Sequence, residues 1–264
     1  MYGEVFLKRA KSGGALVAFK SLIATADMTA AYQEMTREIT AMAAVQHRPE
    51  FPQLLGIINQ TTFAVEFVGD ALTMEARTLR SVVQQPPASL VNVWLVKICG
   101  DVTRGLQALH HAGWSHNDLH CSNVLVWHQP TPLGVIWGAK IIDLGKASRL
   151  NNPPPPYQYD QATKDYCYAH CVHISPEVIE GTAQMGVLAD VFSLGYLFDV
   201  ISHSNPHLTV IETLHRQCSR APQDRPPMQS IMQDIDGFQT VLYQQAMQQL
   251  VAATAPQHNA PAQP

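Results

Sequence analysis

The feature that most constrains this chain is a polar loop of the form H-x-D-x-x-x-x-N at residues 116–123. An apolar helical segment precedes it, and a short apolar strand at 124–126 follows it. Further along the chain, a second apolar run ends at Asp143. If the two apolar strands lie side by side, Asp118, Asn123 and Asp143 point into one cleft. The chain must therefore fold so that two polar turns far apart in sequence meet.

These three side chains have the chemistry that phosphoryl transfer from a nucleotide requires. A carboxylate such as Asp118 can orient and deprotonate an attacking hydroxyl, and Asn123 with Asp143 can hold Mg²⁺ on the phosphates. Either motif alone is also what an unrelated polar turn would give. The remaining elements of the sequence therefore decide whether the two turns form a site.

The composition excludes several classes of protein. The chain has 264 residues, 46% of them hydrophobic, which is enough for one large domain or two lobes with a core. A net charge of −4 with dispersed Lys and Arg predicts no nucleic-acid partner. No apolar run approaches the roughly 20 residues of a transmembrane helix, so we expect no membrane segment. Five cysteines without framework spacing predict a reducing compartment, the cytoplasm.

The character of the chain changes near residue 70. Before it, strand patterns and one Ala-rich helical pattern alternate, with strands expected at 2–7, 15–23, 53–59 and 62–68 and the helix at 29–46. After it, helical patterns dominate, at 72–84, 89–112, 189–202, 207–219 and 227–251, interrupted by a hairpin at 127–139 and a polar loop at 146–174. The shift predicts an α+β chain with two lobes. These are a small β-rich N-lobe over 1–68 and a larger, mainly helical C-lobe over 69–252, followed by a disordered tail at 253–264.

With these elements in order, the sequence resembles the eukaryotic protein kinase superfamily over nearly its whole length. Four short motifs carry the resemblance: Val17-Ala18-Phe19-Lys20 is similar to V-A-x-K, His116-Asn117-Asp118 to H-R-D, Asp143-Leu144-Gly145 to D-F-G and Ser175-Pro176-Glu177 to A-P-E. Three single residues stand where the family has a helix-C glutamate, a buried aspartate that anchors the catalytic loop and an arginine that pairs with A-P-E: Glu38, Asp190 and Arg225. The resemblance implies a protein-kinase-like fold over residues 1–252.

The resemblance also implies a reaction and a site. ATP and Mg²⁺ would be the cofactors, and the partner would be a protein substrate phosphorylated on a Ser/Thr or Tyr hydroxyl. Asp118 would be the catalytic base, Lys20 the phosphate-binding lysine, and Asn123 and Asp143 the metal ligands. The nucleotide pocket would consist of Gly3, Val5, Ala18, Lys20, Glu38, Val65, Glu66, Val68 and Leu125. A stacked column beside it would consist of Met42, Leu55, His116 and Leu144.

Four departures from the family pattern bear on function. Residues 2–6 are similar only to the second half of the Gly-rich loop, so the catalytic domain is read as N-terminally truncated. Asn117 replaces the Arg of H-R-D, a non-RD pattern that predicts activity independent of phosphorylation of the activation segment. His120 stands where Ser/Thr kinases have Lys and tyrosine kinases have Ala, so it fits neither class. A short link joins the helices at 189–202 and 207–219, where the family inserts a docking helix.

Three functions stay open on the sequence alone. An active protein kinase is favoured by the full set of catalytic residues. A pseudokinase that keeps the fold with little turnover is suggested by the incomplete Gly-rich loop. A small-molecule kinase of the aminoglycoside or choline type often has the loop H-x-D-L-H-x-x-N found here. That group, however, lacks the motifs that this sequence has around Glu177, Asp190 and Arg225. A zinc site is a weaker alternative for the polar loop, from Cys167, His170, Cys171 and His173.

Overall fold

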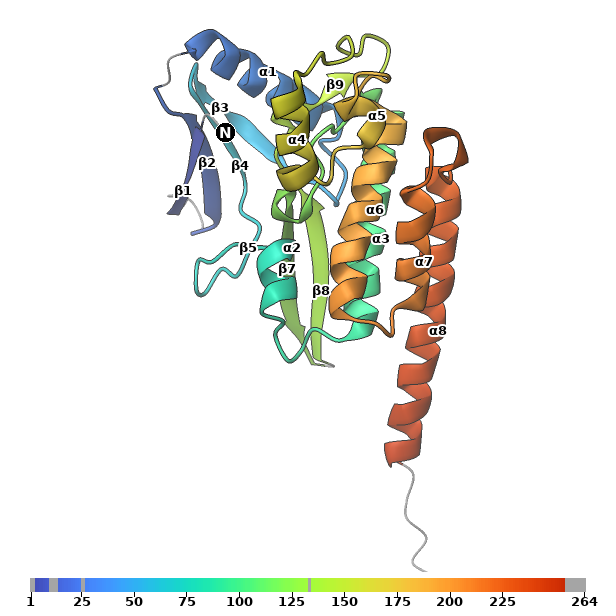
Figure 1. Ribbon diagram of the computed structural model, residues 1–264. Helices are drawn as coiled ribbons and strands as arrows, with labels where there is room; N and C mark the ends of the chain where they lie inside the picture. The colour runs from blue at the N-terminus through green and yellow to red at the C-terminus, as the bar shows by residue number, and fades with distance from the viewer. Residues whose placement is uncertain (1–2, 10–13, 25–26, 133, 255–264) are drawn as a thin grey trace, which may run out of the picture.

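The computed structural model describes residues 3–9, 14–24, 27–132 and 134–254 of the chain (Figure 1). Within these residues the protein has two lobes, a small one built on a sheet and a larger one built mainly of helices. The predicted α+β class, with a β-rich N-lobe and a helical C-lobe, is therefore confirmed.

The small lobe is an antiparallel sheet with one helix against it. Its strands are β1 (Gly3–Arg9), β2 (Leu16–Leu22), β3 (Leu54–Asn59) and β4 (Thr62–Glu66), in the order β1-β2-β4-β3. Helix α1 (Met28–Ala44) begins where the Asp27 side chain accepts a hydrogen bond from a backbone N–H. One face of α1 is buried, and its residues are Ala31, Met35, Glu38, Ala41 and Met42. A carboxylate on a buried face requires a cation opposite it, and the sheet supplies one.

The large lobe is organised around two apolar helices. Helices α3 (Asn92–His111) and α6 (Val187–Ser204) pack against each other, α3 also contacts α8 and β8, and α6 contacts α7. Leu106 and Phe198 are examples of their fully buried side chains, and burying each contributes roughly 1.5–3 kcal/mol. The other helices are α2 (Leu79–Gln84), α4 (Gln161–His170), α5 (Pro176–Ile179), α7 (Thr209–Cys218) and α8 (Met228–Thr254). The strands of this lobe are β5 (Arg77–Thr78), β6 (Trp114–Ser115), β7 (Val124–Thr131), β8 (Gly134–Ile141) and β9 (Ser148–Arg149).

A long hairpin brings the two polar turns of the sequence together. Strands β7 and β8 pair antiparallel, with Val124 opposite Ile141. Because β7 begins directly after Asn123 and β8 ends just before Ile142, the pairing closes the distance between the two turns. The Ile142 N–H donates a hydrogen bond to the Asn123 carbonyl at 2.9 Å. The hairpin thus sets Asn123 beside Asp143, as the sequence pattern requires.

Two predicted segments are wrong in detail. Of the helix expected at 72–84 only α2 is helical, because Arg77 and Thr78 pair with β7 and the Thr78 side chain caps the helix. The loop expected at 146–174 contains α4, which Asp160 caps. Helix α4 buries only Cys167, so it has no apolar stripe from which a helix could be predicted.

Other expectations about the elements are confirmed, corrected in one place, or reach beyond the described residues. The hairpin expected at 127–139 is the β7–β8 pair, and residues 205–208 alone separate α6 from α7. Helix α8 runs to Thr254, so residues 253 and 254 are helical where a disordered tail was predicted. The rest of that tail, 255–264, lies outside the described residues, as does the start of the first predicted strand.

Helix α6 has an unusually apolar composition. Among the described residues it is the helix long and apolar enough to cross a bilayer. A little more than half of it is buried inside the protein, against helices such as α3 and α7. Core helices share this composition, so α6 by itself is weak evidence for a membrane span.

Candidate active site

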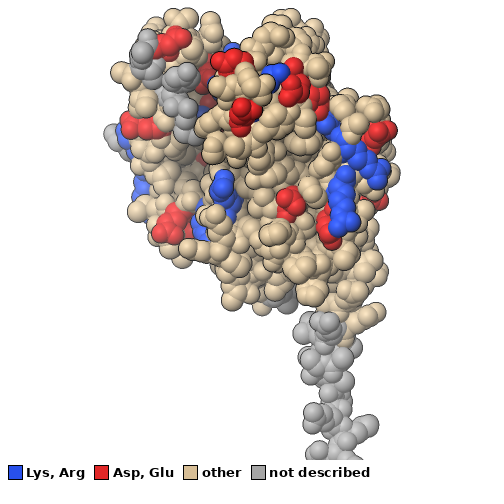
Figure 2. Space-filling model, in the orientation of Figure 1, with Lys and Arg blue, Asp and Glu red and all other residues tan. Residues whose placement is uncertain are grey.

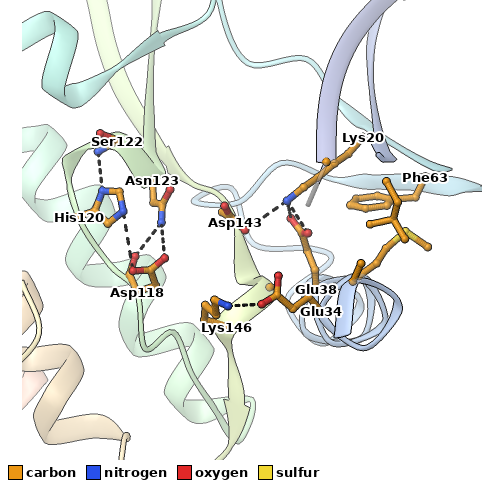
Figure 3. Close-up of a pocket in the computed structure, with 15 residues that line it drawn as sticks. Lys20, Glu34, Glu38, Phe63, Asp118, His120, Ser122, Asn123, Asp143 and Lys146 are labelled. Carbon is orange, nitrogen blue, oxygen red and sulfur yellow. Dashed lines mark hydrogen bonds and ion pairs between the residues drawn. The ribbon is translucent and has the colours of Figure 1, made fainter. Parts of the chain in front are cut away.

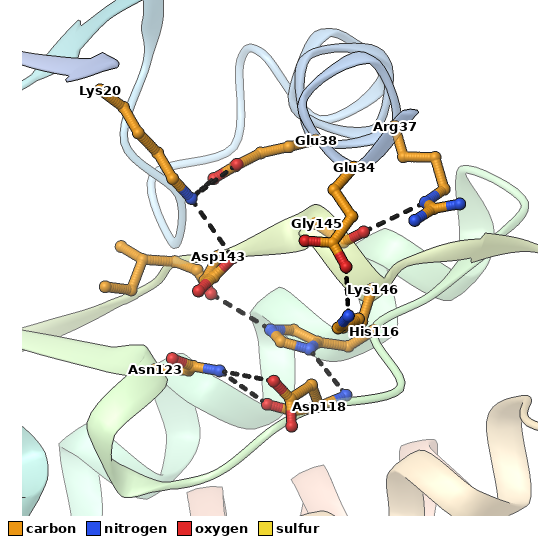
Figure 4. A network of polar contacts seen from close by, with 11 residues as sticks. Lys20, Glu34, Arg37, Glu38, His116, Asp118, Asn123, Asp143, Gly145 and Lys146 are labelled. Atoms are coloured by element: carbon orange, nitrogen blue, oxygen red, sulfur yellow. Dashed lines mark hydrogen bonds and ion pairs between the residues drawn. The ribbon is translucent and has the colours of Figure 1, made fainter. Parts of the chain in front are cut away.

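Lys20 of β2 lies where three segments meet (Figure 4). Its Nζ is 2.6 and 2.8 Å from the two carboxylate oxygens of Glu38 on α1, and 3.3 Å from Oδ1 of Asp143. Burial alone would lower the pKa of Lys20, but the two carboxylates outweigh burial and raise the pKa above its ordinary value. Lys20 is therefore a charged ammonium at neutral pH, shared between the sheet, helix α1 and the end of the hairpin.

Two further contacts hold α1 against the segment that follows Asp143. Nε of Arg37 donates a hydrogen bond to the Gly145 carbonyl at 3.1 Å, and Lys146 forms an ion pair with Glu34 (Figure 4). Both contacts come from the same helix as Glu38, so they keep that residue within reach of Lys20. Burial raises the pKa of Glu38, and the charge of Lys20 opposes this rise.

Asp118 lies across the cleft from Lys20, in the loop between β6 and β7 (Figure 3). Its Oδ1 accepts a hydrogen bond from Nε2 of His173 at 3.0 Å, and Nε2 of His120 is 4.0 Å away. Burial alone would raise the pKa of Asp118, but the hydrogen bond from His173 and the charges of nearby histidines outweigh it and lower the pKa. Asp118 is therefore an ionised carboxylate at neutral pH, the form that a general base requires.

Asn123 and Asp143 present oxygen ligands on the same side of this cleft. Nδ2 of Asn123 is 2.8 Å from the Asp118 carbonyl and 3.5 Å from its Oδ2, so the Asn123 side-chain oxygen is left to face elsewhere. Asp143 has a left-handed backbone with φ 63°, and both residues line one cavity together with Lys20. A carboxylate and an amide oxygen are ligands that suit Mg²⁺, so this donor set fits that ion.

Asp190 of α6 fixes the backbone of the loop that carries Asp118. Its fully buried carboxylate accepts the backbone N–H groups of His116 and Asn117, each at 2.8 Å, and lies 2.8 Å from Nε2 of His110. A buried carboxylate that is satisfied by several donors is strongly held. The position of Asp118 is therefore set by a rigid helix of the core.

Asn117 joins this loop to the activation segment, which we define as residues 143–177. Its Nδ2 donates hydrogen bonds to the Lys146 carbonyl and to Oγ of Ser148, both at 2.9 Å. The backbone of Asn117 has φ 67°, a left-handed conformation that Asn adopts more readily than most residues. The residue that stands at the Arg position of H-R-D thus ties the two segments together through neutral hydrogen bonds.

The far end of the activation segment is held by an ion pair. Nη1 and Nη2 of Arg225 lie 2.5 and 2.9 Å from the two carboxylate oxygens of Glu177, and the Arg225 side chain is only 1% exposed. Burial alone would raise the pKa of Glu177, but the hydrogen bonds from Arg225 outweigh it and lower the pKa. This bidentate contact fixes the activation segment at Glu177, shortly after His173.

The predicted nucleotide pocket forms a single region of the structure. A cavity of about 360 Å³ lies between the two lobes, and it is lined by eight of the predicted residues: Val5, Ala18, Lys20, Glu38, Val65, Glu66, Val68 and Leu125. The ninth, Gly3, lines the adjoining cavity with Asp118, Asn123 and Asp143. Both cavities share Lys20, Glu38 and Asp143, so together they make one cleft. The Glu66 side chain turns to Nζ of Lys140, at 2.7 and 2.8 Å.

One member of the predicted stacked column is wrong. Leu55 is 53% exposed, whereas Leu54 packs against the core. The pairing of β3 with β4 shifts register between Leu54 and Gly56, and such an irregularity breaks the alternation of side chains that the sequence suggests. The other three members, Met42, His116 and Leu144, are buried.

The contact between His173 and Asp118 was not predicted from the sequence. Within the described part of the chain, the carboxylate, His and Cys side chains close enough to share a metal ion are Asp118, His120 and His173. The Cys167 and Cys171 set considered for zinc is therefore not assembled. Burial raises the pKa of the Cys121 thiol to about 12, so this neighbour of the site is not a nucleophile at neutral pH.

Comparisons with known proteins agree with this geometry. A family model described as "Protein kinase domain" matches residues 1–254. Similar curated proteins include cyclin-dependent kinase B2-2 of Arabidopsis thaliana, 26% identical over 75% of this chain, and cyclin-dependent kinase B2-1 of Oryza sativa subsp. japonica, 24% identical over 78%. Cyclin-dependent kinase B2-1 of Arabidopsis thaliana is 23% identical over 75% of the chain.

In each case the match covers 60% of the relative, so the chain spans about 60% of the length of these proteins. The family model, by contrast, extends over both lobes and includes the cleft between them. This chain therefore belongs to the protein kinase family.

Proposed function

We propose that this chain transfers the γ-phosphoryl group of ATP to a hydroxyl of a protein substrate. The observation that carries the proposal is the position of Lys20, whose ammonium contacts both Glu38 and Asp143 in the cleft that also contains Asp118 and Asn123. Phosphoryl transfer depends on positioning and charge stabilisation, and these five side chains supply both.

Each residue has a defined part in the proposed reaction. Lys20 is charged and neutralises phosphate oxygens of the nucleotide. Asp118 is ionised, so it orients the acceptor hydroxyl and takes its proton as the bond to phosphorus forms. Asn123 and Asp143 are the residues that would hold Mg²⁺. That ion, when bound, supplies positive charge to the phosphate groups of the nucleotide. The adenine ring would occupy the apolar cavity between Ala18 and Leu125.

The first test is a labelling experiment with γ-labelled ATP, Mg²⁺ and the whole chain. We expect label on a protein Ser, Thr or Tyr with the wild type and none with Asp143→Asn. The matched control is Asp236→Asn, because Asp236 carries an exposed carboxylate on α8 that pairs with Arg104 outside the cleft. Label that survives in Asp143→Asn would contradict the proposed site.

A binding measurement distinguishes the proposed active kinase from a pseudokinase, which would keep the site without turnover. If the wild type binds a fluorescent ATP analogue and Lys20→Met abolishes this binding, but no label is transferred, the chain keeps the site without turnover. Such a result would overturn the proposed activity.

The predicted location, a reducing cytoplasm, is a separate proposal, supported by five free cysteines of which four are buried.

A further inference from the structure

A second groove opens next to the catalytic carboxylate, on the side away from the nucleotide cavity. It has a volume of about 690 Å³ and lies between α2, the end of α4 and the last turns of α6. The polar groups that line it include Arg80, His120, His170, His173, Asp199 and His203. Neither the nucleotide pocket nor the proposed phosphoryl transfer uses Arg80, His170 or His203.

The groove lies next to Asp118, which lines the adjoining cavity. His120 and His173 line it, and their Nε2 atoms lie 4.0 and 3.0 Å from Oδ1 of Asp118. A peptide whose hydroxyl reaches Asp118 therefore has this groove as a path for its neighbouring residues. Both histidines already have partners. Nε2 of His173 donates to Asp118, and Nδ1 of His120 accepts the Ser122 N–H, which leaves the proton of His120 on Nε2, toward Asp118.

The fixed positive charge of the groove is Arg80. Arg80 is exposed and takes part in none of the ion pairs found among the described residues. His170 and His203 are also exposed at the groove. The one carboxylate of the lining outside the catalytic site, Asp199, lies 3.5 Å from Nε2 of His215 on α7. The groove thus offers a fixed positive charge whose negative partner is missing from the described part of the chain.

The surface view agrees with this distribution. In Figure 2, blue side chains lie over α2, and the surface between α2 and α6 is largely tan with one small red patch. A groove of this kind attracts an anionic group and repels a second cation.

From these observations we infer that the groove binds an anionic side chain, a carboxylate or a phosphate, that flanks the phosphorylated residue of the substrate, and that Arg80 selects it. The inference rests on the proposed kinase function and names the class of substrate that it acts on. The guanidinium matches either anion through paired N–H donors, and phosphate, with more charge, binds more tightly.

The test uses acceptor peptides that differ only at one flanking position, occupied in turn by Glu, phosphoserine or Lys, with that position moved along the peptide. Binding is measured by fluorescence anisotropy without nucleotide, and transfer with labelled ATP. We expect the wild type to bind the best Glu peptide about 5- to 10-fold more tightly than the matching Lys peptide, and the phosphoserine peptide more tightly still. A phosphoserine preference without a Glu preference identifies phosphate as the anion.

Variants assign the preference to one residue. Arg80→Gln should remove it, and Arg80→Glu should reverse it in favour of Lys. Arg77→Gln is the matched control, because Arg77 precedes the same helix but donates to the Gln85 carbonyl at 2.9 Å and does not line the groove. Equal binding of all three peptides by the wild type, or a preference for acid that survives Arg80→Glu, would overturn the inference.

The two measurements distinguish this inference from the proposed function. Acid-selective binding without any phosphoryl transfer would support the groove and contradict the activity. Transfer at equal rates to all three peptides would contradict the groove and support the activity. The wild-type comparison alone decides between these outcomes, and the Arg80 variants then assign the preference to that residue.

Discussion

His173 and Asp118 are 55 residues apart in the chain, yet Nε2 of the histidine lies 3.0 Å from Oδ1 of the carboxylate. The histidine comes from the activation segment, and its carbonyl in turn accepts a hydrogen bond from Oγ of Ser193 on α6 at 2.7 Å. The proposed base is therefore oriented by a segment that is itself fastened to the core. A movement of this segment that carries His173 away would remove this hydrogen bond from Asp118.

This relationship predicts a specific effect of changing His173. His173→Ala removes a hydrogen bond to a charged group, which contributes about 1.5–3 kcal/mol, so kcat should fall by about 10- to 100-fold. The KM for ATP should stay within about twofold, because His173 does not line the nucleotide cavity. Steady-state kinetics with a fixed peptide substrate measures both parameters.

The matched variant is His173→Gln, whose amide N–H reaches roughly as far as Nε2 of the imidazole. We expect it to recover a substantial part of the lost kcat. If Ala and Gln variants lose activity equally while both keep the wild-type unfolding midpoint, His173 acts through something other than the hydrogen bond to Asp118.

Asp118→Asn isolates the contribution of the proposed base. The substitution keeps the shape of the side chain but removes the carboxylate that accepts the proton, so kcat should fall by about 10²- to 10⁴-fold. Binding of ATP, measured with a fluorescent analogue, should be unchanged, since Lys20 and Asp143 are untouched. An Asp118→Asn protein that retains wild-type turnover would remove Asp118 from the base role.

The sequence predicted the parts of the fold that have a strong periodic or motif signal. Helix α6 and the strands around Lys20 have long apolar patterns, and the chemistry of Asp118, Asn123 and Asp143 constrains how they meet. Local patterns sufficed because Asn123 directly precedes β7, Asp143 closely follows β8, and Asp118 lies in the loop that leads into β7.

Features without such a signal were not predictable. Helix α4 is held by its cap and buries one cysteine, so it carries no apolar stripe. Leu55 was misplaced because a register shift cannot be seen in strand alternation alone. The His173 to Asp118 contact depends on the path of a whole loop across the C-lobe, and no spacing rule links the two positions.

Asn117 leads to a prediction about regulation. Its side chain already joins the catalytic loop to Lys146 and Ser148 without a phosphate group. We therefore expect activity to be independent of phosphorylation of the activation segment. Protein treated with a phosphatase should have the same kcat, within about twofold, as untreated protein, and mass spectrometry would verify removal of phosphate.

A variant lacking every Ser, Thr and Tyr hydroxyl from 149 to 174 extends this prediction, and it should retain activity once its folding is verified; Ser148 is kept because its Oγ accepts a hydrogen bond from Asn117. An activity that is lost in this variant and restored by acidic substitutions at the same positions would contradict it. Asn117→Gly provides a further control, because Gly tolerates φ 67° but cannot make the two hydrogen bonds. The Asn117→Gly variant should therefore weaken the contact between the catalytic loop and residues 146 and 148 without straining the backbone.

The Glu177–Arg225 pair predicts how stability depends on pH. The pKa of Glu177 is lower in the folded protein than its ordinary value, so the carboxylate stabilises the fold fully above that ordinary value of 4.5. This contribution declines as the pH falls below 4.5 and is lost once the pH passes the lowered pKa of the folded state. Glu177→Gln should therefore lower the free energy of unfolding by about 2–4 kcal/mol at neutral pH, because it leaves the buried Arg225 without its charge partner.

Urea unfolding of wild type and Glu177→Gln, measured from pH 7 down to acid, checks both the size and the direction. The gap between the two proteins should stay constant from pH 7 down to the ordinary pKa of 4.5 and narrow only below that pH. The control is Glu212→Gln, because Glu212 pairs with Arg216 on the exposed face of α7, where an ion pair contributes less than about 1 kcal/mol. A gap between wild type and Glu177→Gln that stays constant down to strongly acidic pH would show that the ionised carboxylate is not what holds the end of the activation segment, since protonation would then leave the contact intact.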